Sequence, residues 1–268
     1  MNASQLKIII VGGTSGVGLA LAQAHLQQGW QVWVVGHNPQ KINELRNNQP
    51  RIHILNYDLT NIAERKKLFN QMQEIDYCRL IYCAGWYLNE RTSRLNKADS
   101  DTMLAINLQA FQEVFITASE HLKQRDHFIK QDQRTELITI ASVAGLLDYP
   151  YSSLYAQSKQ AMISTANAYR TALVPYGIDV LIIAPGYINT AMLRSLNQGD
   201  ASHKPFIISE DKAINYILAA IEKRVPLTIF PRPMKYMIKG LSLLPKSVLG
   251  WLMLKKLDKP TIPANKSD

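Results

Sequence analysis

Cysteine is scarce in this 268-residue sequence, which contains only Cys78 and Cys83. Cys83 falls within a predicted buried strand, so we expect a structural thiol rather than a disulfide framework or a redox centre. The chain also begins without the charged start and apolar run that form a signal peptide. These absences favour a cytoplasmic protein in a reducing compartment.

Long apolar runs are absent as well, and acidic residues are almost missing from one part of the chain. No run approaches the ~18 consecutive apolar residues that a membrane-spanning helix needs. Residues 223–259 contain nine lysines and arginines and a single acid, Asp258, which accounts for nearly all of the net charge of +9. The remainder is close to neutral, so we expect no nucleic-acid partner.

Short Val- and Ile-rich runs without polar alternation recur along the chain and are typical of strands buried on both faces of a parallel sheet. They alternate with segments long enough for crossover helices, which predicts an α/β doubly wound sheet, a Rossmann fold, of about seven strands. The predicted strands are Lys7–Val11, Gln31–Gly36, Arg51–Asn56, Leu80–Cys83, Glu136–Ile140, Asp179–Ala184 and Leu227–Phe230. We expect one domain over residues 1–230, and a dependent extension over residues 231–268.

A glycine-rich turn directly follows the first predicted strand. Gly12 permits a tight turn, Gly16 lets the backbone approach a pyrophosphate, and Gly18 allows the next helix to pack closely. The intervening Thr14, Ser15 and Val17 open that helix, whose free N–H groups and positive dipole end attract phosphate. The context of strand, turn and helix predicts a dinucleotide site, whereas a purely structural turn is the alternative.

The end of the second predicted strand lacks the carboxylate that usually binds a ribose 2′-hydroxyl. That place holds Gly36, followed by His37 and, further on, Lys41. Without an acid to repel a 2′-phosphate, we favour NADP(H) over NAD(H). His37 and Lys41 are either contacts for that phosphate or solvated surface residues.

Tyr155 and Lys159 stand four residues apart, a spacing that places them on one face of a helix. A nearby ammonium group stabilises phenolate, so we expect Lys159 to lower the pKa of Tyr155 and make it a usable acid and base. Ser142 follows the predicted strand Glu136–Ile140 and therefore lies at the carboxyl edge of the sheet, where ligands bind.

In these features the sequence resembles the short-chain dehydrogenase/reductase family over residues of about 5 to 230. The motifs that carry the resemblance are Gly12-x-x-x-Gly16-x-Gly18, Asp58, Ala84-Gly85, Asn107, Ser142, Tyr155-x-x-x-Lys159 and Pro185-Gly186 with Thr190. The order and spacing of these modest motifs are together specific.

The resemblance implies a role for each matching residue. Tyr155 would protonate the nascent alkoxide, and Lys159 would assist it and hold the nicotinamide ribose. Ser142 would hydrogen-bond the carbonyl oxygen as charge builds there, and Asn107 would position a water in a proton relay. The implied cofactor contacts also include Asp58 and Leu59 at the adenine, Ala84, Gly85, Pro185 and Gly186 along the cleft, and Ile188 and Thr190 at the carboxamide or phosphate. The resemblance implies a homodimer or homotetramer, and it implies no metal.

Two positions depart from the family pattern. Tyr82-Cys83 stands before Ala84-Gly85 where the family usually has two asparagines, and the lost asparagine normally braces the central sheet. Val11 replaces a threonine before the first glycine. The brace must therefore differ, whereas the chemistry is not directly threatened.

Two segments keep alternative interpretations. Residues 191–212 are polar and irregular, and form either a substrate lid or an ordinary surface loop. In residues 231–259, apolar side chains recur at helical spacing with lysines between them. Such basic amphipathic helices suit an anionic membrane surface, but they would also pack on the catalytic domain or on a partner subunit. A similar extension occurs in lipid-handling members of the family that resemble 3-ketosphinganine reductases.

We therefore expect an NADP(H)-dependent oxidoreductase that interconverts a carbonyl and an alcohol, and that reduces a lipophilic ketone or aldehyde near a membrane surface. One alternative keeps the chemistry but assigns a small soluble substrate. Another is a cofactor-binding sensor or scaffold without turnover, although the intact Tyr155 and Lys159 pair argues against it.

Overall fold

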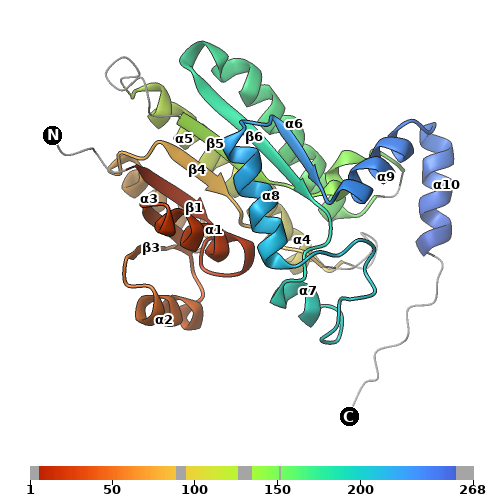
Figure 1. The fold of residues 1–268 in the computed structure, drawn as a ribbon, viewed down its shortest axis with the longest axis horizontal. Helices are drawn as coiled ribbons and strands as arrows, with labels where there is room; N and C mark the ends of the chain where they lie inside the picture. The colour runs from red at the N-terminus through yellow and green to blue at the C-terminus, as the bar shows by residue number, and fades with distance from the viewer. Residues whose placement is uncertain (1–5, 89–94, 126–134, 151, 258–268) are drawn as a thin grey trace.

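The computed structural model describes residues 6–88, 95–125, 135–150 and 152–257. Seven parallel strands form one sheet in the order β3-β2-β1-β4-β5-β6-β7 (Figure 1). Their bounds are β1 Lys7–Val11, β2 Gln31–Gly36, β3 Ile52–Asn56, β4 Arg79–Tyr82, β5 Thr135–Ile140, β6 Ile178–Pro185 and β7 Leu227–Phe230. The doubly wound α/β fold predicted from the sequence is confirmed, and every strand agrees with its prediction to within one residue at each end.

Helices cover both faces of the sheet, which is why most of the strand residues are apolar. One hydrophobic cluster packs α3, α5 and α6 on one face, and a second packs α1, α2 and α8 on the other. The bounds are α1 Gly16–Gln27, α2 Pro39–Asn48, α3 Ile62–Gln73, α4 Lys97–Leu104, α5 Phe111–Lys123, α6 Leu154–Leu173, α7 Ala191–Ser195 and α8 Glu210–Glu222. Between α4 and α5 the chain forms a π-helix over Ala105–Ala110.

The strand order reverses between β1 and β4, because the chain runs outward from β1 to β3 and then returns to the other side of β1. In open parallel sheets, ligands bind beyond the carboxyl ends of the strands at such a reversal. Here Val11 of β1, Val35 of β2 and Tyr82 of β4 are in register, so the loops that follow them start side by side. This edge faces the bottom of Figure 1, near α2 and α7.

A buried charged cluster lies at the opposite edge of the sheet. Nε of Arg79 donates a 2.5 Å hydrogen bond to Glu136, and Nη1 of Arg79 lies 2.9 Å from Nε2 of His25. The guanidinium carbon also lies 4.2 Å from the ring centre of Trp30. The backbone carbonyl of Leu21 binds Nδ1 of His25 at 2.8 Å, so the imidazole is held as the neutral tautomer that accepts from Arg79.

The C-terminal extension forms α9 Arg232–Ser242 and α10 Lys246–Leu257, and its remaining residues, 258–268, lie outside the described part of the chain. Its apolar faces form a third hydrophobic cluster. The buried members of that cluster are Leu147, Met234, Ile238 and Leu249. Of the alternatives left open by the sequence, packing on the catalytic domain is therefore observed for these faces, with Leu147 supplied by the loop after Ser142.

Another set of apolar side chains on the extension stays exposed. These are Tyr236, Leu243, Val248, Trp251 and Leu252. None of the helices formed by the described residues is both long and apolar enough to cross a bilayer.

Candidate active site

The glycine-rich turn follows β1 and opens α1, as expected. Gly12 has a φ of 81°, and a Cβ added there would lie 2.6 Å from the backbone of Ala84. A Cβ on Gly18 would lie 2.2 Å from the carbonyl oxygen of Gly12. Side chains at either position would push the turn away from β4 and from α1. The glycines therefore let the turn pack closely and leave the N-terminus of α1 open to a phosphate group.

Gly36 ends β2 directly beside this turn. A Cβ on Gly36 would lie 2.4 Å from Oγ1 of Thr14, so steric contact excludes an acidic side chain here. Nearby, Nζ of Lys41 donates a 3.2 Å hydrogen bond to Oγ of Ser15, which is the N-cap residue of α1. His37 is exposed beyond the strand. The cation of Lys41 and the hydroxyl of Ser15 thus face the same space at the edge of the turn.

Asp58 and Leu59 follow β3 along the same edge. Oδ1 of Asp58 accepts 2.8 Å hydrogen bonds from the backbone N–H and the hydroxyl of Thr60. The carbonyl of Leu59 accepts a 2.7 Å hydrogen bond from the buried Arg65. These contacts fix the loop after β3.

Ser142, Tyr155 and Lys159 converge at the carboxyl ends of β5 and β4. Ser142 follows β5, and its Oγ accepts a 3.2 Å hydrogen bond from the N–H of Ala144. Tyr155 is the second residue of α6, which begins after the capping side chain of Ser153. Lys159 lies one turn further along α6, and its Nζ lies 5.8 Å from the centre of the Tyr155 ring. Tyr155 and Lys159 therefore share one face of α6, as predicted.

Lys159 is almost completely buried, with 3% of its surface exposed. Its Nζ donates to the carbonyl of Ile140 at 3.4 Å, and a Cβ on Gly85 would lie 3.4 Å from the same atom. Burial lowers the pKa of Lys159 to about 8, because the charged ammonium loses water and gains no carboxylate within the described residues. The glycine therefore leaves room for the cation at the floor of the site.

The pKa of Tyr155 differs from the expectation. Burial raises it to about 12, although a hydrogen bond with Ser142 acts in the opposite direction. The expected lowering by Lys159 is not seen in the protein alone, because loss of water around the phenol outweighs a cation that lies beside the ring. At neutral pH Tyr155 is thus a protonated acid.

Asn107 lies in the π-helix and is fully buried. Its Oδ1 accepts from the N–H of Trp86 at 2.8 Å, and its Nδ2 donates to the carbonyl of Trp86 at 2.9 Å and to Oγ of Ser158 at 3.2 Å. Asn107 thereby joins the loop after β4 to the helix that carries Tyr155. The sequence identified Asn107 but gave no signal for the π-helix.

A different brace of the central sheet is found at Tyr82, the first of the two positions where the family pattern has asparagines. The hydroxyl of the buried Tyr82, at the end of β4, donates a 2.5 Å hydrogen bond to the carbonyl of Ile106 in the π-helix. The neighbouring Cys83 has its pKa raised to about 12 by burial, which agrees with a structural thiol. Tyr82 therefore connects the sheet to the turn that carries Asn107.

The residues after β6 form the other wall of the cleft. The N–H of Gly186 donates to the carbonyl of Phe230 at 2.8 Å, which extends the pairing of β6 with β7 beyond Pro185. Ile188 pairs with Ile208 in an isolated parallel bridge, and the side chain of Thr190 caps α7 by accepting from Leu193. The segment 191–212 is thus attached at both ends beside the predicted cofactor positions.

Tyr87 and Tyr187 lie near Tyr155, and Tyr149 lies near Tyr187; none of the three was identified from the sequence. The rings of Tyr87 and Tyr155 meet edge to face with their centres 4.7 Å apart. Tyr187 is close enough to Tyr155, Tyr87 and Tyr149 to raise the pKa of each. Isolated tyrosines in loops carry no sequence pattern, so only the fold could bring this group together.

Glu210 is another residue near the site that the sequence did not identify. It is the first residue of α8, and its Oε1 lies 4.0 Å from the position of a Cβ on Gly16. Burial raises the pKa of Glu210, whereas the nearby Arg194 lowers it. A carboxylate therefore lies against the phosphate-binding turn.

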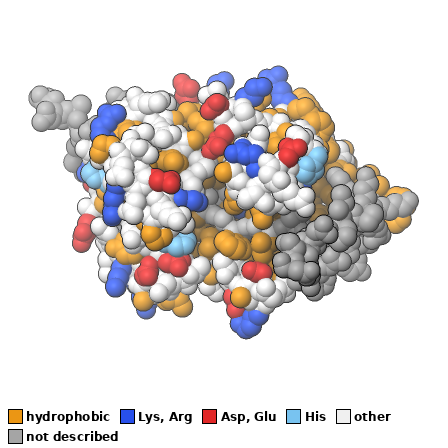
Figure 2. All heavy atoms as spheres, turned by 90° about the horizontal axis from the view of Figure 1, so that it is seen from below, with side chains coloured by type: hydrophobic (Ala, Val, Ile, Leu, Met, Phe, Trp, Pro, Cys, Tyr) orange, Lys and Arg blue, Asp and Glu red, His pale blue; other side chains and the backbone are white. Residues whose placement is uncertain are grey.

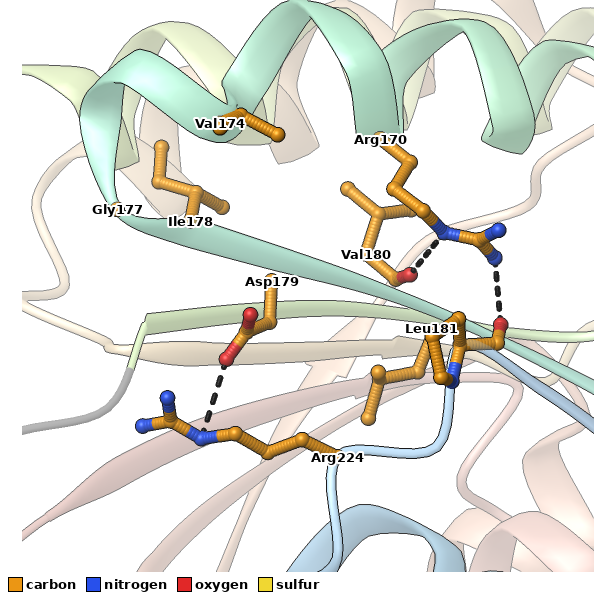
Figure 3. A pocket seen from close by; sticks show the side chains of 9 residues that line it. Arg170, Val174, Gly177, Ile178, Asp179, Val180, Leu181 and Arg224 are labelled. Atoms are coloured by element: carbon orange, nitrogen blue, oxygen red, sulfur yellow. Dashed lines mark hydrogen bonds and ion pairs between the residues drawn. The ribbon is translucent and has the colours of Figure 1, made fainter.

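Seen from below (Figure 2), the molecule is hollowed near the middle of this face, and hydrophobic side chains are visible there among charged ones. A different pocket of about 230 Å³ lies at the opposite edge of the sheet (Figure 3). There Arg170 donates to the carbonyls of Val180 and Pro226 at 3.0 and 2.5 Å, and Arg224 pairs with Asp179 at 3.2 Å. Its arginines are thus engaged by the chain itself.

Comparison with known proteins identifies the family. The family model described as short chain dehydrogenase matches residues 7–201, which is most of the chain. The chain belongs to the short-chain dehydrogenase family. As a family member it is an oxidoreductase that interconverts alcohols and carbonyl compounds.

Curated relatives share the same region of this short-chain dehydrogenase. A 3-oxoacyl-[acyl-carrier-protein] reductase FabG from Rickettsia typhi is 27% identical over 191 residues, which cover 71% of this chain and 76% of the relative. An uncharacterized oxidoreductase from Staphylococcus epidermidis is 27% identical over 198 residues, which cover 72% and 82%.

Solved structures share the fold of this family member over its whole length. A short-chain dehydrogenase from Sphingobium yanoikuyae in complex with NADPH superposes with a TM-score of 0.75 at 18% identity, covering 97% of this chain and 99% of that one. A bulky-bulky ketone specific alcohol dehydrogenase from Comamonas testosteroni gives 0.74 at 16% identity, covering 98% of each.

Proposed function

We propose that this protein is an NADP(H)-dependent carbonyl reductase, in which Tyr155 is the proton donor. The observation that carries the proposal is the convergence of Ser142, Tyr155 and Lys159 at the sheet edge beside an open glycine turn. Such a site meets the needs of hydride transfer, which are a bound nucleotide, an acid and a stabiliser of developing negative charge.

The residues fit a dinucleotide with a 2′-phosphate. Gly12, Gly16 and Gly18 leave the backbone accessible at the N-terminus of α1, where N–H groups attract pyrophosphate. The pair of Lys41 and Ser15 offers a cation and a hydroxyl where an acid would favour NAD(H) instead. The relative from Sphingobium yanoikuyae was solved with NADPH, and one from Burkholderia cenocepacia with NADP.

We propose that the remaining predicted residues also contact the dinucleotide. They are Thr14 and Val17 at the turn, His37 at the ribose, Asp58 and Leu59 at the adenine, Ala84, Gly85, Pro185 and Gly186 along the floor, and Ile188 and Thr190 at the nicotinamide end.

When bound, the nicotinamide would supply the hydride. The hydroxyl of Ser142 would hydrogen-bond the carbonyl oxygen of the substrate as it gains negative charge. Tyr155, protonated at neutral pH because its pKa is about 12, would then give its proton to that oxygen. Lys159 would place positive charge beside the phenolate that remains, and Asn107 would hold the loop after β4 in place.

A lipophilic substrate is supported by the walls of the site. Tyr87 and Tyr187 lie near Tyr155, and Tyr149 lies near Tyr187. Met234 of α9 packs against Gly186, and its side chain would lie 3.1 Å from a Cβ added to that glycine. We propose that the extension acts as part of the catalytic domain, as this packing requires.

Contact with an anionic membrane surface is part of the same proposal. The exposed apolar side chains of α9 and α10 include Tyr236, Leu243 and Trp251, and lysines such as Lys235 and Lys239 interleave with them. Apolar and basic groups on one protruding element suit attachment to anionic lipid. Flotation with anionic vesicles tests this, since a protein that stays at the bottom of the gradient would contradict it and favour a small soluble substrate.

A second candidate substrate is a 3-oxoacyl chain on an acyl-carrier protein. It is favoured by the names of several curated relatives, which are 3-oxoacyl-[acyl-carrier-protein] reductases at 26–28% identity. Reduction of a 3-oxoacyl thioester but not of simple ketones would support it. We also propose a homo-oligomer, which light scattering would test.

The decisive experiment for the chemistry is Tyr155→Phe. We expect NADPH oxidation with a panel of ketones and aldehydes to fall at least about a hundredfold, because the proton donor is lost. NADPH binding, followed by calorimetry, should persist. Tyr236→Phe is the matched control, since this tyrosine is exposed on α9. Turnover that survives Tyr155→Phe would refute the mechanism, and tight binding without turnover in the wild type would favour a sensor.

A further inference from the structure

A lysine of the segment between α7 and α8 lies over the tyrosine cluster. Nζ of Lys204 is 5.7 Å from the ring centre of Tyr187. The backbone N–H of Lys204 donates to the carbonyl of Ala201, a residue with 1% of its surface exposed. Ile208 then donates to the carbonyl of Tyr187 at 3.1 Å. The backbone on each side of Lys204 is therefore held, and the cation stays near Tyr187.

Tyr187 connects this cation to the catalytic residues. It follows Pro185-Gly186 directly, its electrostatic influence raises the pKa of Tyr155, and it packs on the cluster that contains Leu147 and Met234. Lys204 thus lies beside Tyr187, which is near enough to Tyr155 to influence its pKa and packs in the same cluster as Met234 of α9.

Lys204 has no carboxylate partner among the residues that the structure describes. The acid nearest to it in sequence, Asp200, accepts instead from the N–H and hydroxyl of Ser202 at 2.8 and 2.7 Å. Lys204 is partly buried, and this loss of water around the ammonium lowers its pKa. A half-buried cation without an anion is unfavourable unless a ligand completes it.

From this geometry we infer that Lys204 binds an anionic group of the substrate. The inference rests on the proposed function and narrows its substrate to a carbonyl compound with an apolar body and a carboxylate or phosphate group. The rings of Tyr87, Tyr149 and Tyr187 contact the apolar body, and Lys204 pairs with the charge at the mouth of the site. A charge-assisted hydrogen bond there contributes to substrate binding rather than to the chemical step.

The test compares matched charged and neutral substrates. Oxo-fatty acids, with the carbonyl at different distances from the carboxylate, are compared with their methyl esters. A 3-oxoacyl-coenzyme A, which carries phosphates, is compared with the neutral N-acetylcysteamine thioester of the same acid. These two arms distinguish a carboxylate from a phosphate as the source of charge. Each is measured with wild type, Lys204→Met and Lys204→Arg, with Lys212→Met as the control, because Lys212 is an exposed lysine on the adjoining helix.

We expect wild type to prefer the charged member of at least one pair. Lys204→Met should raise KM for that member about tenfold or more, with kcat and the neutral member changed less than about twofold. Lys204→Arg should recover much of the loss, and Lys212→Met should resemble wild type. Equal effects on both members, or no preference in wild type, would overturn the inference. A wild type that reduces no carbonyl compound at all would instead refute the proposed function.

Discussion

Nζ of Lys159 lies 5.8 Å from the centre of the Tyr155 ring, and burial shifts the pKa values of the two groups in opposite directions, up for Tyr155 and down for Lys159. Tyr155 has a pKa of about 12 and Lys159 one of about 8, so near neutral pH a phenol stands beside an ammonium group. This is the protonation state that reduction of a carbonyl requires.

The pair predicts the pH dependence of reduction. Because the pKa of Lys159 is lowered to about 8, its positive charge is present below that pH and is lost above it. We expect kcat/KM for carbonyl reduction to fall as the pH rises through about 8. In Lys159→Arg, which stays charged, any remaining activity should persist to higher pH. A wild-type profile that is flat from pH 7 to about 9.5 would contradict the assignment.

Lys41 predicts the choice of cofactor. Lys41→Met removes the cation that bonds Ser15, and with it the partner expected for a 2′-phosphate. We expect the affinity for NADPH to fall about tenfold while that for NADH changes little. Dissociation constants from calorimetry check this, with Lys67→Met on α3 as an exposed control. Equal weakening of both nucleotides would show that Lys41 does not read the phosphate.

Glu210 predicts an electrostatic cost to cofactor binding. Its carboxylate lies against Gly16, so Glu210→Gln should tighten NADPH binding about threefold or more. Since the pKa of Glu210 is raised, wild type should bind more tightly as the pH falls toward that pKa, and the glutamine variant should lose this dependence. Asp211→Asn, at the next residue, is the control. Weaker binding in Glu210→Gln would contradict the prediction.

Tyr82 predicts a stability effect. Tyr82→Phe leaves the buried carbonyl of Ile106 without its 2.5 Å hydrogen bond, which should lower the free energy of unfolding by about 1–3 kcal/mol. Urea unfolding measures this, with Tyr236→Phe as an exposed control. If both variants unfold at the same urea concentration, Tyr82 is not the brace of the central sheet.

His25 predicts sensitivity to acid. Burial and Arg79 lower its pKa from 6.5 to about 4, so between these pH values the unfolded chain binds more protons than the folded one. Stability should therefore fall by about 3 kcal/mol as the pH drops from 6.5 to 4 on account of this group. His25→Gln should be less stable at neutral pH but flatter in that range. His203→Gln, at an exposed site, should keep the wild-type slope.

Much of the fold followed from local patterns. In the strand Lys7–Val11 every residue after the lysine is apolar and buried, which makes the strand recognisable in the sequence. Tyr155 and Lys159 share one helix, so their spacing alone placed them together. Glu210, Lys204 and Tyr187 could not be found in this way, because the fold brings them to the site from separate loops and helix ends.

Other features depend on contacts with residues far away in the sequence, which local patterns do not reveal. The periodicity of α9 predicted an apolar face, but only the structure could place Leu147 against it. The absence of an acid at Gly36 was interpreted as cofactor choice, and the contact with Thr14 supplies a steric reason as well. The π-helix that contains Asn107 accepts a hydrogen bond at Ile106 from Tyr82, which lies 24 residues earlier in the sequence than Ile106.

The packing of α9 and α10 against the loop after Ser142 also bears on the order in which the site is assembled. Met234, Ile238 and Leu249 follow every catalytic residue in the chain, yet they close the wall behind Leu147. A growing polypeptide can therefore complete its sheet and nucleotide turn while its substrate side is still open. The binding surface for the carbonyl compound is finished only when the last helices have left the ribosome.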